Sequence, residues 1–131
     1  MHRRHATVLA LALAASPASA YEPERAMENL ASDFSTCAAY LLVAAKAMEG
    51  QDEETSAAYT YEAGRFIALS NEATNEEVAA ARIEVAATEM MEEIDNDASN
   101  LMILFAKHGK LCQEIAADIQ GRFDYWLDKK D

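Results

Sequence analysis

Cys37 and Cys112 each lie within a run of mostly apolar residues that recur alternately three and four positions apart. The first run consists of Met27, Leu30, Phe34, Cys37, Leu41, Ala44 and Met48. The second consists of Leu101, Phe105, His108, Cys112, Ile115 and Ile119. This spacing predicts two helices, each with one apolar seam. If the helices run antiparallel with the cysteines level, Phe34 faces Ile115 and the two seams match. The pattern therefore predicts a Cys37–Cys112 disulfide that sets the register of the two helices.

The start of the chain has the pattern of a secretory signal peptide. Two arginines precede an apolar stretch at residues 6–15, and the small residues 18–20 follow it. The apolar stretch is too short to span a bilayer. We expect cleavage of residues 1–20 before Tyr21, which leaves a single domain over residues 21–131. The alanine-rich leader is typical of bacteria, so the predicted destination is the periplasm or the exterior of the cell.

A chain with two cysteines in an oxidising compartment most simply forms one intramolecular disulfide. A Cys37–Cys112 bridge would close a loop that covers most of the domain, and the chain-entropy model gives such a loop roughly 4 kcal/mol of stabilisation. The cysteine spacing matches neither a zinc knuckle nor a covalent haem motif. We therefore assign both cysteines a structural role.

Acidic residues dominate the chain. It has 11 lysines and arginines against 23 aspartates and glutamates, a net charge of −12, and loss of Arg3 and Arg4 with the leader makes this −14. Nucleic acids and anionic lipid surfaces are bound through clustered cations, so this balance argues against both as partners. No later apolar run is long enough to insert into a membrane after cleavage. A basic protein partner is compatible with this charge.

The composition after the leader favours helices throughout, because alanine, glutamate, leucine and methionine dominate and only one proline remains. The predicted helices cover residues 23–49, 52–70, 75 to 95–97, and 97–99 to 121. Thr74 or Asn75 precedes the third helix, and Thr74 with Glu77 matches a capping box. Gly64, inside the second helix, is expected to let a neighbouring helix approach closely. A break near Gly121 would leave a short amphipathic segment that folds over the end of the bundle.

The predicted fold class is all-α: an up-down-up-down antiparallel four-helix bundle with one disulfide and a short C-terminal helical segment. A break at residues 96–100 decides this topology. Without it, the third and fourth helices would fuse into one long rod. The antiparallel match of the two cysteine seams favours the break.

Few residues could carry catalysis. The acidic residues fall in runs typical of solvated helix faces and helix starts, and the sequence has neither a Gly-x-Ser-x-Gly elbow nor a glycine-rich phosphate loop. His108 is the one histidine after the leader, so a multi-histidine metal site is excluded. We expect a non-enzymatic protein, and we name no catalytic, cofactor-binding or metal-binding residue.

A haem or small-ligand carrier is an alternative function. Met27 and His108 resemble the axial ligand pair of soluble four-helix cytochromes. The seam register, however, places the two residues about 14 positions apart along the bundle, which corresponds to roughly 21 Å. One iron cannot reach both side chains, so no cofactor is predicted.

Exposed aromatic residues are the candidates for an interaction surface. Tyr59 and Tyr61 are two positions apart and cannot both face the core, and we assign the exposed position to Tyr59. Tyr125 and Trp126 are the other two candidates. The leading hypothesis is an exported, non-enzymatic protein-interaction module with an acidic surface. The alternative to it, besides a ligand carrier, is a periplasmic immunity or inhibitor protein against a cell-wall hydrolase.

Overall fold

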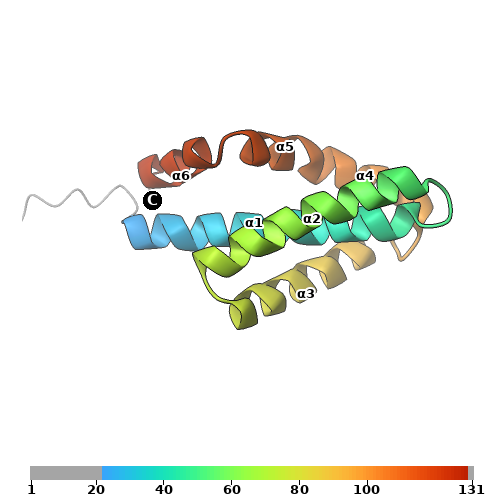
Figure 1. The fold of residues 1–131 in the computed structure, drawn as a ribbon, viewed down its shortest axis with the longest axis horizontal. Coiled ribbons are helices and arrows are strands. Elements are labelled where there is room, and N and C mark those ends of the chain that lie inside the picture. The colour runs from blue at the N-terminus through green and yellow to red at the C-terminus, as the bar shows by residue number, and fades with distance from the viewer. Residues whose placement is uncertain (1–21, 130–131) are drawn as a thin grey trace, which may run out of the picture.

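The computed structural model describes residues 22–129 and is all-helical over that range (Figure 1). The long helices are α1 (Pro23–Met48), α2 (Glu53–Ala73) and α3 (Glu76–Glu93). The final segment contains a 3-10 turn (Ala98–Asn100), α4 (Met102–Leu104), a π-helical segment (Phe105–Gly109), α5 (Lys110–Ala117) and α6 (Ile119–Asp128). Among these described helices, none is long and apolar enough to cross a bilayer. The predicted signal peptide lies outside the described residues.

Helix α1 is the centre of the structure. Helices α2, α3 and α6 all pack against it, whereas α3 makes only light contact with α2. In Figure 1, α1 and α3 run in one direction, and α2 and the final segment return in the other. Between Ala38 and Ala45, every residue except Leu42 is buried. A helix buried on nearly all sides has to be apolar nearly all round, and the small side chains of its alanines let its neighbours approach closely.

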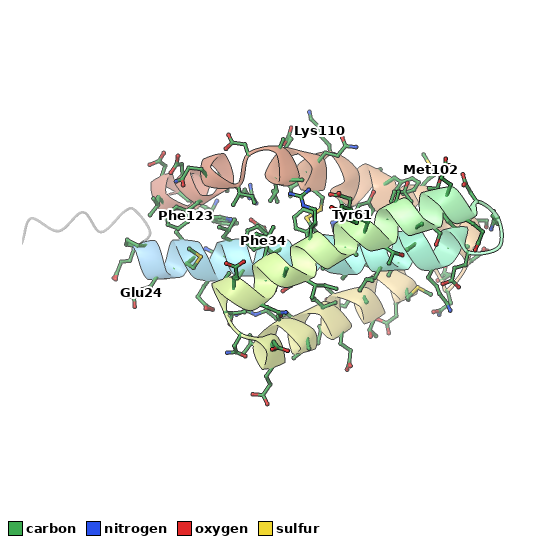
Figure 2. The ribbon with its side chains drawn as sticks, in the orientation of Figure 1. Glu24, Phe34, Tyr61, Met102, Lys110 and Phe123 are labelled. Carbon is green, nitrogen blue, oxygen red and sulfur yellow. A yellow bond between two sulfur atoms is a disulfide. The ribbon has the colours of Figure 1, made fainter. Side chains whose placement is uncertain are left out.

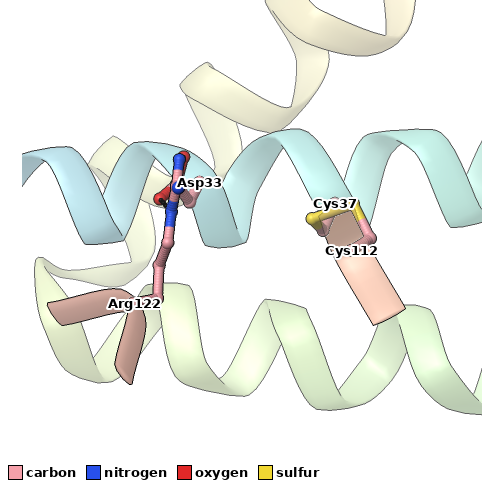
Figure 3. Close-up of a disulfide and its surroundings, with 4 residues drawn as sticks. All are labelled: Asp33, Cys37, Cys112 and Arg122. Carbon is pink, nitrogen blue, oxygen red and sulfur yellow. Dashed lines mark hydrogen bonds and ion pairs between the residues drawn. A yellow bond between two sulfur atoms is a disulfide. The ribbon is translucent and has the colours of Figure 1, made fainter. Parts of the chain in front are cut away.

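The predicted disulfide is confirmed. The Cys37 and Cys112 sulfurs are bonded and their Cα atoms lie 5.6 Å apart, within the usual range for a disulfide. The bond joins α1 to α5 (Figure 3). Phe34 and Ile115, which the seam register places opposite each other, both belong to the buried core. The all-α class and the bridge between the two seams are therefore correct.

The helix starts follow the capping residues of the sequence. Pro23 is the first residue of α1, as its fixed φ and missing N–H favour. The Asp52 carboxylate accepts a hydrogen bond from the Thr55 amide at 3.0 Å and caps α2. Asn75 caps α3 by accepting from the Val78 amide at 2.9 Å, so Asn75 supplies the side-chain cap in place of the predicted Thr74–Glu77 box.

The predicted break between the third and fourth helices is also present. After α3, Asp95 and Asn96 both adopt the left-handed conformation, with φ values of 56° and 52°. This conformation is uncommon for residues other than glycine, and aspartate and asparagine tolerate it best. The chain therefore turns before the 3-10 segment, and the fused rod does not form.

The expected break between the fourth helix and a short C-terminal helical segment is present, but it lies earlier than Gly121. Asp118 has an extended backbone (φ −151°, ψ 80°) and lies between α5 and α6. Its carboxylate accepts a hydrogen bond from the Gly121 amide at 2.9 Å, which caps α6. The break thus falls three residues before Gly121, and Gly121 lies in the first turn of α6. Helix α6 packs along α1 and does not fold over the end of the bundle.

The π-helical segment changes which residues of the second seam reach the core. Leu104, which is not part of the predicted seam, is fully buried, whereas Phe105 and His108 are half-buried. A π turn contains one residue more than an α turn, so it shifts the phase of the side chains around the helix. Leu101, Cys112 and Ile115 remain buried as the seam predicts.

Candidate functional site

Helix α3 and the turn after it form an acidic ridge. Its exposed carboxylates are Glu76, Glu77, Glu84, Glu89, Glu92, Glu93, Asp95 and Asp97. The same stretch of sequence contains a single cation, Arg82, which pairs with Glu28 of α1 at 2.9 Å. Lys107 of the π-helical segment pairs with Glu93 at 2.8 Å. The ridge therefore has a strong negative charge on a surface-facing helix.

A groove lies between α2 and α3 beside this ridge. Its volume is about 470 Å³. Apolar side chains make up most of its lining: Leu42, Ile67, Ala80, Ile83 and Ala87. Asn71, Glu76 and Glu84 complete the lining, and both glutamates are exposed. The arrangement combines apolar surface with negative charge, which we call the acidic groove.

The groove stays open because α3 packs mainly on α1 and only lightly on α2. Within α3, only Ala79 and Met90 are buried. Ile83, a large apolar residue of this helix, is only half-buried. Leu42 of α1 is exposed at the base of the groove, although the residues around it in sequence are buried. Apolar side chains that remain accessible in a cleft are suited to contact another molecule.

The sequence pattern did not point to this groove. Leu42 lies outside the seam that contains Leu41. A large aliphatic residue outside the apolar seam, such as Leu42, was the feature of the sequence that could have indicated this groove.

Tyr59 does not lie on the exposed face of α2, so that expectation is wrong. Its side chain is half-buried, and its ring centroid lies 6.3 Å from that of Phe105. Tyr61 is instead 71% exposed, and Figure 2 labels it on α2. The two tyrosines do diverge as helical geometry requires. The final segment covers the face of Tyr59, because Phe105 of the π-helical segment packs there.

Tyr125 and Trp126 lie side by side on α6, with ring centroids 5.0 Å apart. Tyr125 is 47% exposed. The Trp126 indole N–H donates to the Asp33 carboxylate at 2.7 Å, which ties it to α1. Tyr125 lines a cleft at the α5–α6 junction, whereas Tyr59 lines a different cavity beside α1. The three predicted interaction residues therefore do not form one surface.

His108 lies in the π-helical segment, with its ring 5.7 Å from the ring of Tyr40. Within the described residues, its buried Nε2 has no hydrogen-bond partner. Burial lowers the pKa of His108, and the neighbouring Lys107 lowers it further, against an opposing effect of Glu93. No group of three or more potential metal ligands occurs in residues 22–129. The position of His108 is thus one that favours a neutral imidazole.

Comparison with family models, with curated proteins and with solved structures finds no match to this chain. The acidic groove joins an apolar lining and two carboxylates at a single place.

Proposed function

We propose that this chain is a non-enzymatic protein-interaction module whose acidic groove binds a basic amphipathic helix of a partner. The observation that carries the proposal is the combination of an apolar groove with the carboxylates of Glu76 and Glu84 beside it. A helix with one apolar face and flanking lysines or arginines complements both features. The rest of the proposed architecture is an antiparallel four-helix bundle in which the segment from α4 to α6 acts as the fourth arm.

The charge of the chain supports a cationic partner. A net charge of −12 creates a long-range attraction that raises the association rate of a basic molecule. Exposed charges contribute modestly to affinity once the complex forms. The apolar residues Leu42, Ile67 and Ile83 would then supply the area that is removed from water.

The proposed place of action is the periplasm or the exterior of the cell. The disulfide is compatible with export, because such bonds persist in oxidising compartments. The signal peptide that would direct export is a prediction from the sequence alone. Processing is tested by expressing the full chain in a bacterium and determining the N-terminal residue of the exported form, which we expect to be Tyr21.

Binding can be tested with two synthetic peptides of the same composition. The first is a lysine–leucine peptide of about 18 residues, long enough to follow α3, with all its leucines on one helical face. The second contains the same residues, with the leucines distributed around the helix. Fluorescence anisotropy should show that the first peptide binds roughly ten-fold more tightly at physiological salt. Equal affinities would mean that the attraction is only nonspecific charge, and would contradict the proposal.

Variants of the chain locate the binding site. Replacement of both groove glutamates, Glu76→Gln with Glu84→Gln, should weaken binding of the amphipathic peptide several-fold. The matched control is Glu114→Gln, an exposed acidic residue of α5 outside the groove. We expect the control to bind like the unchanged protein. A control that loses as much affinity as the double variant would place the binding site elsewhere.

A narrower form of the proposal is an inhibitor of a basic cell-wall hydrolase, which would contact the same acidic ridge. Val85, exposed on α3 amid the ridge carboxylates, provides an apolar contact for such a partner. Co-expression with a panel of basic periplasmic hydrolases tests this form. Rescue of growth that is lost in the Glu76→Gln, Glu84→Gln variant would support it, and failure to rescue across the panel would reject it.

A further inference from the structure

A second cavity, of about 200 Å³, lies between α1, α2 and the final segment beside the disulfide. All three elements contribute to its wall. Its most informative lining residues are Tyr40, Tyr59, Glu62, Phe66, Cys112 and Gln113. Three of these are aromatic, and one is a carboxylate. The cavity shares no lining residue with the acidic groove, so its properties are independent of the proposed function.

The aromatic wall is held in place by its neighbours. The Tyr40 ring packs edge-on against Phe105 at 6.2 Å between centroids and lies 5.7 Å from the His108 ring. Phe105 also contacts the ring of Tyr59. Phe105 of the π-helical segment thus packs against the rings of both tyrosines. A wall fixed in this way loses little conformational entropy when a ligand binds.

Gly109 makes room for the Tyr40 hydroxyl. A Cβ atom at position 109 would lie 3.3 Å from that oxygen, closer than nearly all ordinary contacts. Gly109 also lines the cavity. An alanine at this position would require the Tyr40 hydroxyl to shift by a few tenths of an ångström.

The chemistry of the cavity favours a cation with an apolar surface. The faces of aromatic rings attract cations, most strongly where water is excluded. Glu62 adds a negative charge, although one of its oxygens also pairs with Arg65 at 3.0 Å. Only one carboxylate lines the cavity, too few for the six to eight oxygen ligands that a calcium ion takes. A methylated ammonium group needs no such set of ligands, because its charge is spread over its methyl groups.

We propose that this cavity binds a small organic cation with a trimethylammonium head group, held between Tyr40, Tyr59 and Phe66 with Glu62 as its counter-charge. Its methyl groups would contact the rings, and its net charge would interact with the ring faces and the carboxylate. A neutral molecule of the same shape would keep the dispersion contacts and lose the electrostatic ones.

The test compares choline with 3,3-dimethyl-1-butanol, which replaces the charged nitrogen by carbon at nearly constant shape. Isothermal titration calorimetry is carried out on the oxidised full chain. We expect saturable binding of choline and roughly ten-fold weaker binding of the neutral alcohol. Equal binding of the two probes would overturn the cation assignment. An absence of saturable binding at about 10 mM choline would overturn the site itself.

Two variants place the binding in the cavity. Tyr59→Ala should weaken choline binding by roughly ten-fold, whereas Tyr61→Ala, exposed on the same helix, should leave it unchanged. Tyr59→Ala also removes a packing contact, so Glu62→Gln serves as a milder change. It should lower the affinity for choline without altering the affinity for the neutral alcohol. Choline affinity that is unaffected by Glu62→Gln and by a folded Tyr59→Ala variant would contradict the proposal. The acidic groove is untouched by these changes, so a failure here is separate from a failure of peptide binding.

Discussion

Arg122 of α6 donates a hydrogen bond from Nε to the Asp33 carboxylate of α1 at 2.7 Å (Figure 3). Asp33 lies one helical turn before Cys37 in α1. Asp33 also accepts hydrogen bonds from Arg122 Nη2 and from the Trp126 indole. The disulfide holds α5 and the ion pair holds α6, on either side of the break at Asp118. The final segment is therefore attached to α1 at two neighbouring points, and the bend between them brings α6 back along α1.

Removal of the Asp33 carboxylate should destabilise the fold measurably. Both side chains of the ion pair are largely buried, with exposures of 17% and 14%. Asp33→Ala leaves the Arg122 charge and the Trp126 N–H without this acceptor, at a cost of about 2–3 kcal/mol. Urea unfolding followed by the fluorescence of the single tryptophan measures this free energy.

The control for this change is the exposed ion pair between Lys46 and Glu49, whose side chains are 76% and 61% exposed. Glu49→Ala should alter the free energy of unfolding by no more than about 0.5 kcal/mol, because exposed pairs contribute little. If Asp33→Ala costs no more than this control, the Asp33 contacts do not hold α6 on α1.

Loss of the disulfide should lower stability while leaving the helices formed. The double variant Cys37→Ala, Cys112→Ala avoids a free thiol and removes the constraint on the unfolded chain, at a cost of roughly 3–4 kcal/mol. For a domain of this size, the melting temperature should fall by on the order of 10–20 °C. Circular dichroism provides both the melting curve and the helix content. Equal melting of the oxidised protein and the variant would show that the bridge adds no stability.

Stability should decrease as the pH falls from about 7 to 5, and His108 is the cause. Burial holds the pKa of His108 below its ordinary value, so the unfolded chain takes up a proton first, below about pH 6.5. Proton uptake by the unfolded state lowers the free energy of unfolding until the folded state is protonated as well. Chemical unfolding of residues 21–131 at several pH values measures this slope. In His108→Phe the slope in this range should be lost, and an unchanged slope would assign it to another group.

Two glycines should respond differently to alanine. A Cβ at Gly64 meets no atom within 4 Å, so the predicted close approach of a neighbouring helix there is wrong. Gly64→Ala should stabilise the protein by about 0.5–1 kcal/mol through helix propensity. A Cβ at Gly121 would instead clash with the Asp118 carboxylate that caps α6. Gly121→Ala should therefore stabilise the protein less than Gly64→Ala does, and equal gains would show that the Asp118 carboxylate shifts without cost.

The parts of the fold that the sequence predicts are those with a local or paired pattern. The two seams share one cysteine register, so the disulfide follows from them. Pro23 and Asp52 mark helix starts because their backbone and side-chain chemistry acts within one turn. The break before the last helix was expected near Gly121 and lies at Asp118, because glycine is the usual sign of a break. In this chain, an aspartate three residues before the glycine ends one helix and caps the next.

Contacts between distant segments explain the remaining differences. The exposure of Tyr59 depends on Phe105, which approaches from the final segment and covers it. The acidic residues of α3 can be recognised in the sequence. The open groove beside them arises because α3 packs mainly against α1 and only lightly against α2. Likewise, the π-helical segment contributes to the wall of the aromatic cavity. The apolar spacing of this segment in the sequence predicts an ordinary α-helix, so the cavity could not be predicted from it.

The most direct test of the interaction proposal is a map of where the basic amphipathic peptide binds. Titration of the ¹⁵N-labelled, oxidised protein with this peptide, followed by two-dimensional NMR, reports the change at each backbone amide. The largest chemical-shift changes should fall on residues that line the acidic groove, among them Leu42, Ile67, Ile83 and Glu84. Changes that concentrate on α6 around Tyr125, or that spread evenly over all acidic residues, would contradict the account.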